Sequence, residues 1–145
     1  MVDYGSDIGG GREDAMLTLF VAKSHARDAD VKKAADSFKG LPAKVFHVEH
    51  DDINRVPLFT PWYAVIYDDE VIDEKLQAAL VPFMVQVKAD ALVCFKSDRT
   101  KAPRLFRSHL RLQPKSLLPA NPGVKFEYVL NGMFKRQDHV ENRVR

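Results

Sequence analysis

The sequence predicts a single α/β domain of three layers, in which helices flank a mainly parallel or mixed sheet. The chain has 145 residues, which is enough for one domain of ordinary size. Hydrophobic residues make up 46% of it and charged residues 29%, as in a globular protein with its own core. Short apolar runs alternate with helical patterns, which favours layered α/β architecture. We expect the domain to occupy residues 16–134, between a Gly-rich tail at 1–15 and a polar tail at 135–145.

The first half of the chain predicts a strand, a helix and a second strand. Leu17–Ala22 is an apolar run with β-branched and aromatic residues, which is typical of a buried strand. The following helix ends before Gly40 and Pro42, because both residue types interrupt helices. Residues 44–48 form the next strand, and the helical crossover favours parallel pairing. The apolar face of the helix, spaced i, i+3, i+4 and i+7, consists of Val31, Ala34, Ala35 and Phe38.

The alternation continues through the middle of the chain. A loop at residues 50–61 precedes the third strand, Trp62–Tyr67, and residues 91–95 form the fourth. The helix between these strands is expected to be kinked or split at Pro82, because proline removes a backbone donor. The apolar face of this helix consists of Ile72, Leu76, Ala79, Leu80 and Phe83.

Beyond Lys96 the pattern weakens. Residues 97–123 contain four prolines among many basic residues and are predicted to be mostly loop. Residues 125–130 are compatible with a last strand. Asn131-Gly132 is a turn signal, so that strand is expected to end there.

Composition excludes several classes of protein. The single cysteine, Cys94, excludes an internal disulfide and a multi-cysteine zinc site, and it is expected to be a small core residue. We therefore expect a reducing, cytoplasmic location. No run of 18 apolar residues is present, so no membrane span is predicted. The first residues lack the basic and apolar regions of a secretory signal. The sequence does not indicate an oligomeric state.

Charge is distributed in two blocks, although the net charge is only +2. Residues 49–74 contain eight acidic residues and one basic residue, whereas residues 96–115 contain seven basic residues and one acidic residue. These blocks are either two sides of one binding site or two solvated surfaces. On a helix, Arg104, Arg107 and Arg111 would form a basic stripe able to contact a phosphate backbone, but we expect nucleic-acid binding less than a solvated face.

The third predicted strand ends in three consecutive acids, Asp68, Asp69 and Glu70. Ligands of open α/β sheets bind beyond the carboxyl ends of strands. Two carboxylates there can hold Mg²⁺ or Mn²⁺, which would neutralise a diphosphate. Alternatively, the acids form the first turn of the next helix, with Asp68 or Asp69 as its N-cap, because the helix dipole favours negative charge there. The pattern leaves both interpretations open.

The stretch PWYAVIYDDEVIDEKLQAAL at residues 61–80 resembles the central segment of family-2 glycosyltransferases with the GT-A fold. In that family a strand opening with Trp runs into an Asp-x-Asp-Glu motif and then a helix. ADALVCFK at 89–96, KAPRLFRSHLRL at 101–112 and residues 124–134 resemble the segments that follow. The resemblance covers roughly residues 16–134 and is best over 61–107. In this chain Tyr67 stands where the family has its first Asp, and the segment between the second and third strands is shorter.

The resemblance implies a nucleoside-diphosphate sugar as the partner, with Mg²⁺ or Mn²⁺ as the cofactor. Asp69 would contact the cation or the donor sugar-diphosphate, with Asp68 or Glu70 assisting. A possible base for the acceptor hydroxyl is Glu127, the acid near the last strand. The resemblance also implies that Glu49 contacts the nucleoside.

Two basic residues complete the implied site. Arg104 and Arg107 would meet phosphate oxygens, for which the guanidinium fork is suited. Three function hypotheses follow. The chain is a small glycosyltransferase-like protein, or a non-catalytic binding or accessory module of the same fold, or a phosphate or nucleic-acid binder that uses residues 96–115.

Overall fold

The computed structural model describes residues 6–7, 16–23, 28–38, 41 and 43–137. They form a mixed α/β domain, as predicted. The strands are β1 (Ser6–Asp7), β2 (Leu17–Ala22), β3 (Ala43–Val48), β4 (Trp62–Tyr67), β5 (Glu70–Ile72), β6 (Ala91–Lys96), β7 (Lys101–Arg107) and β8 (Phe126–Arg136). The helices are α1 (Asp28–Asp36), the 3-10 helix η1 (His50–Arg55) and α2 (Glu74–Gln86).

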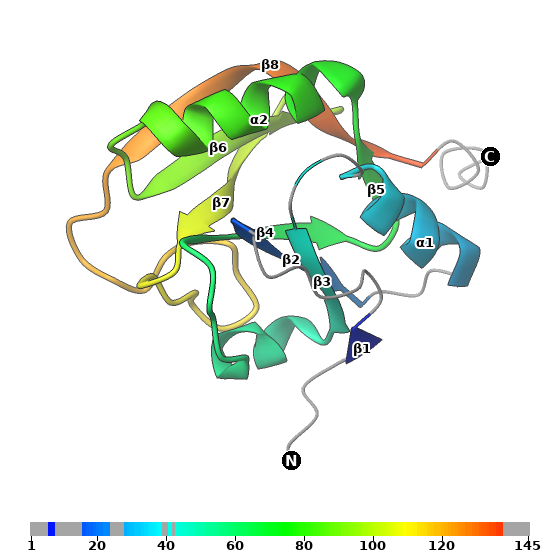
Figure 1. The fold of residues 1–145 in the computed structure, drawn as a ribbon, viewed down its shortest axis with the longest axis horizontal. Helices are drawn as coiled ribbons and strands as arrows, with labels where there is room; N and C mark the ends of the chain where they lie inside the picture. The colour runs from blue at the N-terminus through cyan, green and yellow to red at the C-terminus, as the bar shows by residue number, and fades with distance from the viewer. Residues whose placement is uncertain (1–5, 8–15, 24–27, 39–40, 42, 138–145) are drawn as a thin grey trace.

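All these strands belong to one mixed sheet, with the order β1-β3-β2-β4-β7-β6-β8-β5. The predicted strand–helix–strand unit is present, because β2 pairs in parallel with β3 and also with β4. β7 is antiparallel to both β4 and β6, and β6 is parallel to β8. Consequently β2, β3, β4, β6 and β8 all run in the same direction. Figure 1 shows that the sheet is curled rather than flat.

The two faces of the sheet carry separate apolar clusters. In β2, Leu17, Leu19 and Val21 join the cluster beneath α1 and α2, whereas Phe20 and Ala22 join the cluster on the other face. This division follows from the alternation of side chains along a strand. The second cluster takes further members from η1 and the coil after β7, including Ile53, Leu110 and Leu112. The third layer is therefore not an α-helical one, as the three-layer prediction implied, but a 3-10 helix with coil.

The acidic strand end does not start a helix, so the N-cap interpretation of Asp68 and Asp69 is wrong. A short strand, β5, follows the two residues, and α2 begins only at Glu74. The N-cap is Asp73, whose side chain accepts a hydrogen bond from the Leu76 backbone N–H at 2.9 Å. α2 also continues past Pro82, so the helix is not split.

Two features after Lys96 differ from the prediction. Part of the expected loop, Lys101–Arg107, is strand β7, although it contains Pro103. The register of β6 and β7 shifts between Leu92 and Val93, and such an irregularity accommodates a proline that cannot donate to the ladder. β8 does not end at the predicted turn, because Gly132 adopts a φ of 83° within the strand beside a second register shift.

The two predicted tails are described only in part. Ser6–Asp7 pairs with β3 as β1, and the rest of 1–15 lies outside the described residues. At the other end β8 reaches Arg136 and Gln137 is buried, whereas a polar tail was expected from residue 135. Residues 138–145 lie outside the described residues. Among those described, no helix is both long and apolar enough to cross a membrane.

Candidate functional site

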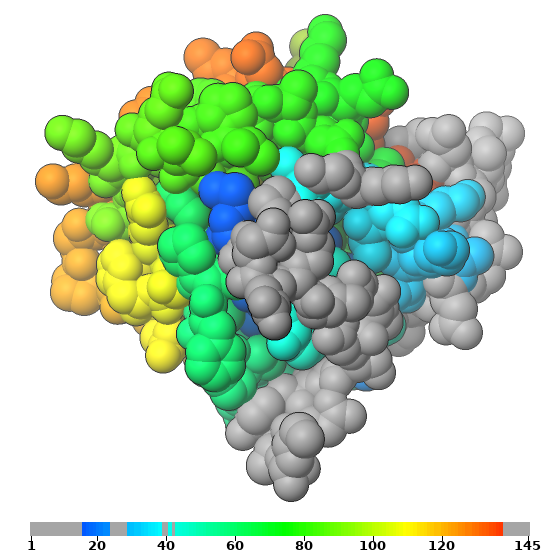
Figure 2. All heavy atoms as spheres, in the orientation of Figure 1, coloured from blue at the N-terminus to red at the C-terminus, as the bar shows by residue number. Residues whose placement is uncertain are grey.

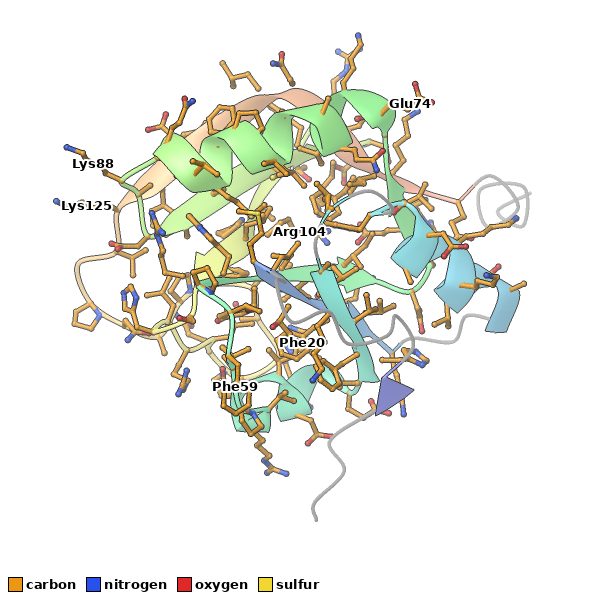
Figure 3. The ribbon with its side chains drawn as sticks, viewed as in Figure 1. Phe20, Phe59, Glu74, Lys88, Arg104 and Lys125 are labelled. Atoms are coloured by element: carbon orange, nitrogen blue, oxygen red, sulfur yellow. The ribbon has the colours of Figure 1, made fainter. Side chains whose placement is uncertain are left out.

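A pocket with a volume of about 420 Å³ lies where three strands of the same direction finish. Tyr67 is the last residue of β4, Lys96 is the last residue of β6, and Phe134 and Arg136 lie at the end of β8; all four line the pocket. Arg104, from the middle of β7, lies near the centre of the molecule in Figure 3 and also lines the pocket. Because α/β sheets bind ligands beyond the carboxyl ends of their strands, this pocket is the candidate functional site.

The lining combines charged groups with two aromatic rings. Beside the residues already named, it is lined by Asp69, Glu70, Ser97 and Asp98. Asp98 is held by the β6–β7 turn, because its carboxylate accepts hydrogen bonds from the backbone N–H and the hydroxyl of Thr100. The Thr100 hydroxyl and then its N–H lower the pKa of Asp98, so this carboxylate is fully ionised at neutral pH.

Asp68 points away from the pocket. Its side chain is buried, and its Oδ2 lies 3.2 Å from Nε2 of His47 on β3. The backbone N–H of Asp68 donates to the Ala22 carbonyl at 3.1 Å, which extends the β2–β4 ladder by one residue. Asp68 therefore links the end of β4 to β2 and β3 and does not line the pocket, whereas it was predicted to be a metal ligand.

Glu70 forms a two-point ion pair with Arg104 at the base of the pocket. The Nη1–Oε1 distance is 2.7 Å and the Nη2–Oε2 distance is 2.9 Å. Arg104 is 1% exposed, and its guanidinium carbon lies 4.4 Å from the Phe134 ring centre. Glu70 Oε1 also accepts from the Tyr67 backbone N–H at 3.0 Å. Glu70 was predicted to bind a cation and Arg104 a phosphate. In the structure the two side chains neutralise each other, so the charge of each is already compensated.

Asp69 is the predicted acid that reaches the pocket outside a buried ion pair. Its carboxylate is 29% exposed and lies 3.9 Å from the guanidinium of Arg136, which is itself half exposed. Burial is the main cause of a raised pKa for Asp69, and the neighbouring Glu70 adds to it, while Arg136 opposes it. A partly buried carboxylate with a perturbed pKa in a pocket is a typical feature of a functional site.

Gln137 positions the acidic turn and was missed by the sequence analysis. Its backbone N–H donates to the Asp69 carbonyl at 2.9 Å. Its side-chain amide nitrogen lies 3.2 Å from the Asp68 carbonyl, 3.3 Å from that of Glu70 and 2.7 Å from that of Asp30. No local pattern marks this glutamine, because its function depends on groups far away in the sequence.

Three other predicted site residues lie away from the pocket. Glu49 is exposed in the position before η1 and does not line the pocket. Arg107 donates to the carbonyls of Val87 at 2.7 Å and Ala89 at 3.2 Å, and its guanidinium stacks 4.1 Å above Trp62. These contacts place Arg107 at the amino end of β4, opposite the acidic end, where it joins α2 to the sheet rather than binding a phosphate.

Glu127 is also separated from Asp69. It is exposed on β8 and pairs in register with Leu92, near the start of β6, whereas the pocket lies beyond the end of β6. The structure therefore does not bring the two predicted catalytic acids together.

The basic stripe is not helical. Arg104 and Arg107 belong to β7, where Arg104 is buried and Arg107 half-buried, and Arg111 lies in the coil beyond. Arg104, Arg107 and Arg111 therefore do not form one basic surface that a phosphate backbone could contact.

Of the three residues predicted to hold a cation, Asp69 is the one whose carboxylate lines the pocket outside a buried ion pair. Among the described residues, no group of three or more His, Cys, Asp or Glu side chains is placed to hold a metal ion. Burial raises the pKa of Tyr67, which replaces the first acid of the resembled motif, so its phenol stays protonated at neutral pH. Asp69 is the carboxylate that the turn offers to the pocket.

Comparison of the chain with protein-family models, with curated proteins and with solved structures found no match.

Proposed function

We propose that the pocket at the ends of β4, β6 and β8 binds a phosphorylated sugar, with nucleoside-diphosphate sugars as the ligand class. The observation that carries the proposal is the lining, in which the Asp69 carboxylate faces Arg136 beside Lys96 and Ser97. Guanidinium and ammonium groups bind phosphate oxygens, and a carboxylate accepts hydrogen bonds from sugar hydroxyls. The half-buried ring of Tyr67 also lines the pocket, whereas the ring of Phe134 is fully buried beneath the Arg104 guanidinium.

Size and location support the same ligand class. A volume of about 420 Å³ lies within the range of small-molecule sites, which span ~300–1,000 Å³. The resemblance to GT-A glycosyltransferases predicts such a ligand at the end of the same strand, and Asp69 is the residue to which it assigns the donor contact. The pocket lining and the sequence resemblance therefore both favour Asp69 as the carboxylate that contacts the ligand.

Mg²⁺ or Mn²⁺ would bind together with the ligand. Proteins commonly hold Mg²⁺ through one or two carboxylates, with substrate phosphates supplying further oxygens. Asp69 would supply the carboxylate, and a diphosphate would supply the remaining charge. The chemistry that the cation contributes is neutralisation of the diphosphate.

The arrangement favours a binding module over a transferase. Asp68 is held by His47, Glu70 is held by Arg104, and Glu127 lies on another part of β8. Of the predicted acids, Asp69 is then the one left to serve the donor, the cation and the acceptor, and Asp98 is the other ionised carboxylate of the lining. The raised pKa of Asp69 favours sugar transfer as a second candidate, because a carboxyl with a raised pKa is a better proton acceptor.

Isothermal titration calorimetry tests the proposal. UDP, GDP and their sugars are titrated into the chain with and without Mn²⁺, and we expect binding that Mn²⁺ strengthens. Asp69→Asn should weaken the Mn²⁺-dependent binding by at least about tenfold. The control is Asp51→Asn, which removes an exposed carboxylate outside the pocket.

Two outcomes decide between the candidates. If millimolar sugar nucleotide gives no heat of binding in either metal condition, the proposal is wrong. Conversion of a bound sugar nucleotide to free nucleotide, with the sugar passed to an added hydroxyl acceptor or to water and followed by ³¹P NMR, would favour the transferase, whereas binding without conversion in the presence of acceptor favours the module.

A further inference from the structure

The hydroxyl of Tyr67 lies at the pocket and takes no part in holding the fold together. Tyr67 is the last residue of β4, and its half-buried side chain lines the pocket. The charges that act on its phenol are those of Arg104, Glu70 and Asp69, which line the same pocket. None of the described residues exchanges a hydrogen bond with this hydroxyl. The Tyr67 hydroxyl is therefore a donor that the fold leaves unused.

The ring that carries this hydroxyl is nevertheless held by its neighbours. The Tyr67 backbone N–H donates to Glu70 Oε1 at 3.0 Å, and the Arg104 guanidinium carbon lies 5.3 Å from the ring centre. The His50 ring is nearly parallel to that of Tyr67, with 6.3 Å between the ring centres and 15° between the planes. A side chain that is already ordered loses little conformational entropy when a ligand binds. The position of Tyr67 is therefore suited to direct recognition of a ligand.

Two more donors of the same kind line the pocket, the Lys96 ammonium at the end of β6 and the Ser97 hydroxyl next to it. Within the described part of the chain, neither makes a side-chain hydrogen bond or an ion pair, although the charge of Lys96 acts on Asp98. This end of the sheet reaches solvent, because Arg136 is half exposed and Figure 2 shows orange-red atoms from the last part of β8 at the surface. A ligand can therefore reach a lining that offers three unused donors.

We propose that Tyr67 is a specificity residue of this pocket, whose hydroxyl donates a hydrogen bond to a phosphate oxygen of the ligand. The inference rests on the proposed function and assigns one contact within it. An ionised phosphate accepts hydrogen bonds and donates none, so it matches a lining with unused donors, whereas a sugar hydroxyl suits the acceptor Asp69. Burial raises the pKa of the Tyr67 phenol, which keeps it a donor at neutral pH.

Tyr67→Phe tests this contact, because the substitution removes the hydroxyl and keeps the ring. Isothermal titration calorimetry in the presence of Mn²⁺ measures the affinity for UDP-glucose and for UDP, two probes that share the diphosphate and differ in the sugar. We expect Tyr67→Phe to weaken the binding of both probes by about tenfold, since each loses a hydrogen bond to a charged group. The matched control is Tyr128→Phe, which removes the hydroxyl of an exposed tyrosine outside the pocket and should leave both affinities unchanged.

Thermal denaturation without ligand separates recognition from a structural role. Because the fold leaves the hydroxyl unused, Tyr67→Phe should unfold at the same midpoint as the unchanged chain, and a lower midpoint contradicts the proposal. A loss of affinity for UDP-glucose but not for UDP places the contact on the sugar and overturns the phosphate assignment. If the unchanged chain binds and Tyr67→Phe binds equally well, the inference alone is wrong. If the unchanged chain binds neither probe, the proposed function is wrong and the inference with it.

Discussion

Glu70 and Arg104 form a buried ion pair that joins the acidic turn after β4 to the middle of β7. Two hydrogen bonds of 2.7 and 2.9 Å connect them, and the guanidinium also donates to the Val65 carbonyl at 3.2 Å. The pair forms part of the pocket wall between the rings of Tyr67 and Phe134. It thereby determines that Asp69, rather than Glu70, is the acid offered to a ligand.

Breaking this pair should strongly destabilise the fold. Arg104→Met leaves Glu70 buried without its counter-charge, and we expect a loss of about 3–5 kcal/mol in the free energy of unfolding. Chemical denaturation followed by circular dichroism measures the loss.

The matched control is the double variant Glu70→Gln/Arg104→Met. The glutamine keeps an acceptor for the Tyr67 N–H but carries no charge, so the double variant should be more stable than Arg104→Met alone. A double variant that is as unstable as the single one would show that packing, not charge, accounts for the loss.

The ionised carboxylate of Asp69 should lower the free energy of unfolding at neutral pH. Its pKa in the folded state is raised above the ordinary value of 3.8, so the folded state holds this proton to higher pH than the unfolded state. Stability from this group therefore falls as pH rises from 3.8 through the folded pKa, and the deficit persists at neutral pH.

Asp69→Asn should accordingly be more stable than the unchanged chain at pH ~7, and this gain should vanish at acidic pH below the ordinary aspartate value. Urea titrations at the two pH values measure the difference, with Asp51→Asn as the exposed control. An Asp69→Asn variant that is less stable at neutral pH would show that attraction to Arg136 outweighs burial.

Gly132 should not tolerate a side chain. Its φ is 83°, and a Cβ there would collide with the Leu76 backbone N and the Asp73 carboxylate, which forms the N-cap of α2. Gly132→Ala should therefore lower the free energy of unfolding by at least about 3 kcal/mol, because the backbone is strained and the helix cap is lost.

Gly123→Ala is the matched control, because Gly123 has a similar φ of 67° but no atom within 4 Å of the added Cβ. It should cost only the strain, about 1–2 kcal/mol. Equal costs at the two glycines, measured by thermal and chemical denaturation, would contradict the collision argument.

Cys94 should be unreactive in the folded chain. It is fully buried, and desolvation raises the pKa of its thiol to about 12, so the reactive thiolate is scarce at neutral pH. A thiol reagent should label the native chain only as fast as the chain unfolds, and label it at once in denaturant. Labelling of the native chain at the rate of an exposed thiol would contradict the buried position.

The sequence by itself determined the strands whose apolar runs are continuous, because such runs can be buried only as strands at this length. β2 and β4 have the predicted bounds, and α1 uses the predicted apolar face, including Val31 and Ala34. Cys94 occupies the core position that its neighbours predicted. The sequence also located the acidic end of β4, beside which the pocket lies.

Only the tertiary structure decided what each acid does, because each one is determined by a partner that is distant in sequence. Asp68 is paired with His47 and Glu70 with Arg104, while Gln137 orients the turn between them. The strand that supplies Arg104 was hidden by Pro103, which a central strand tolerates only beside an irregular register. Local patterns record burial and backbone preference, whereas charge pairing across the sheet depends on which strands become neighbours.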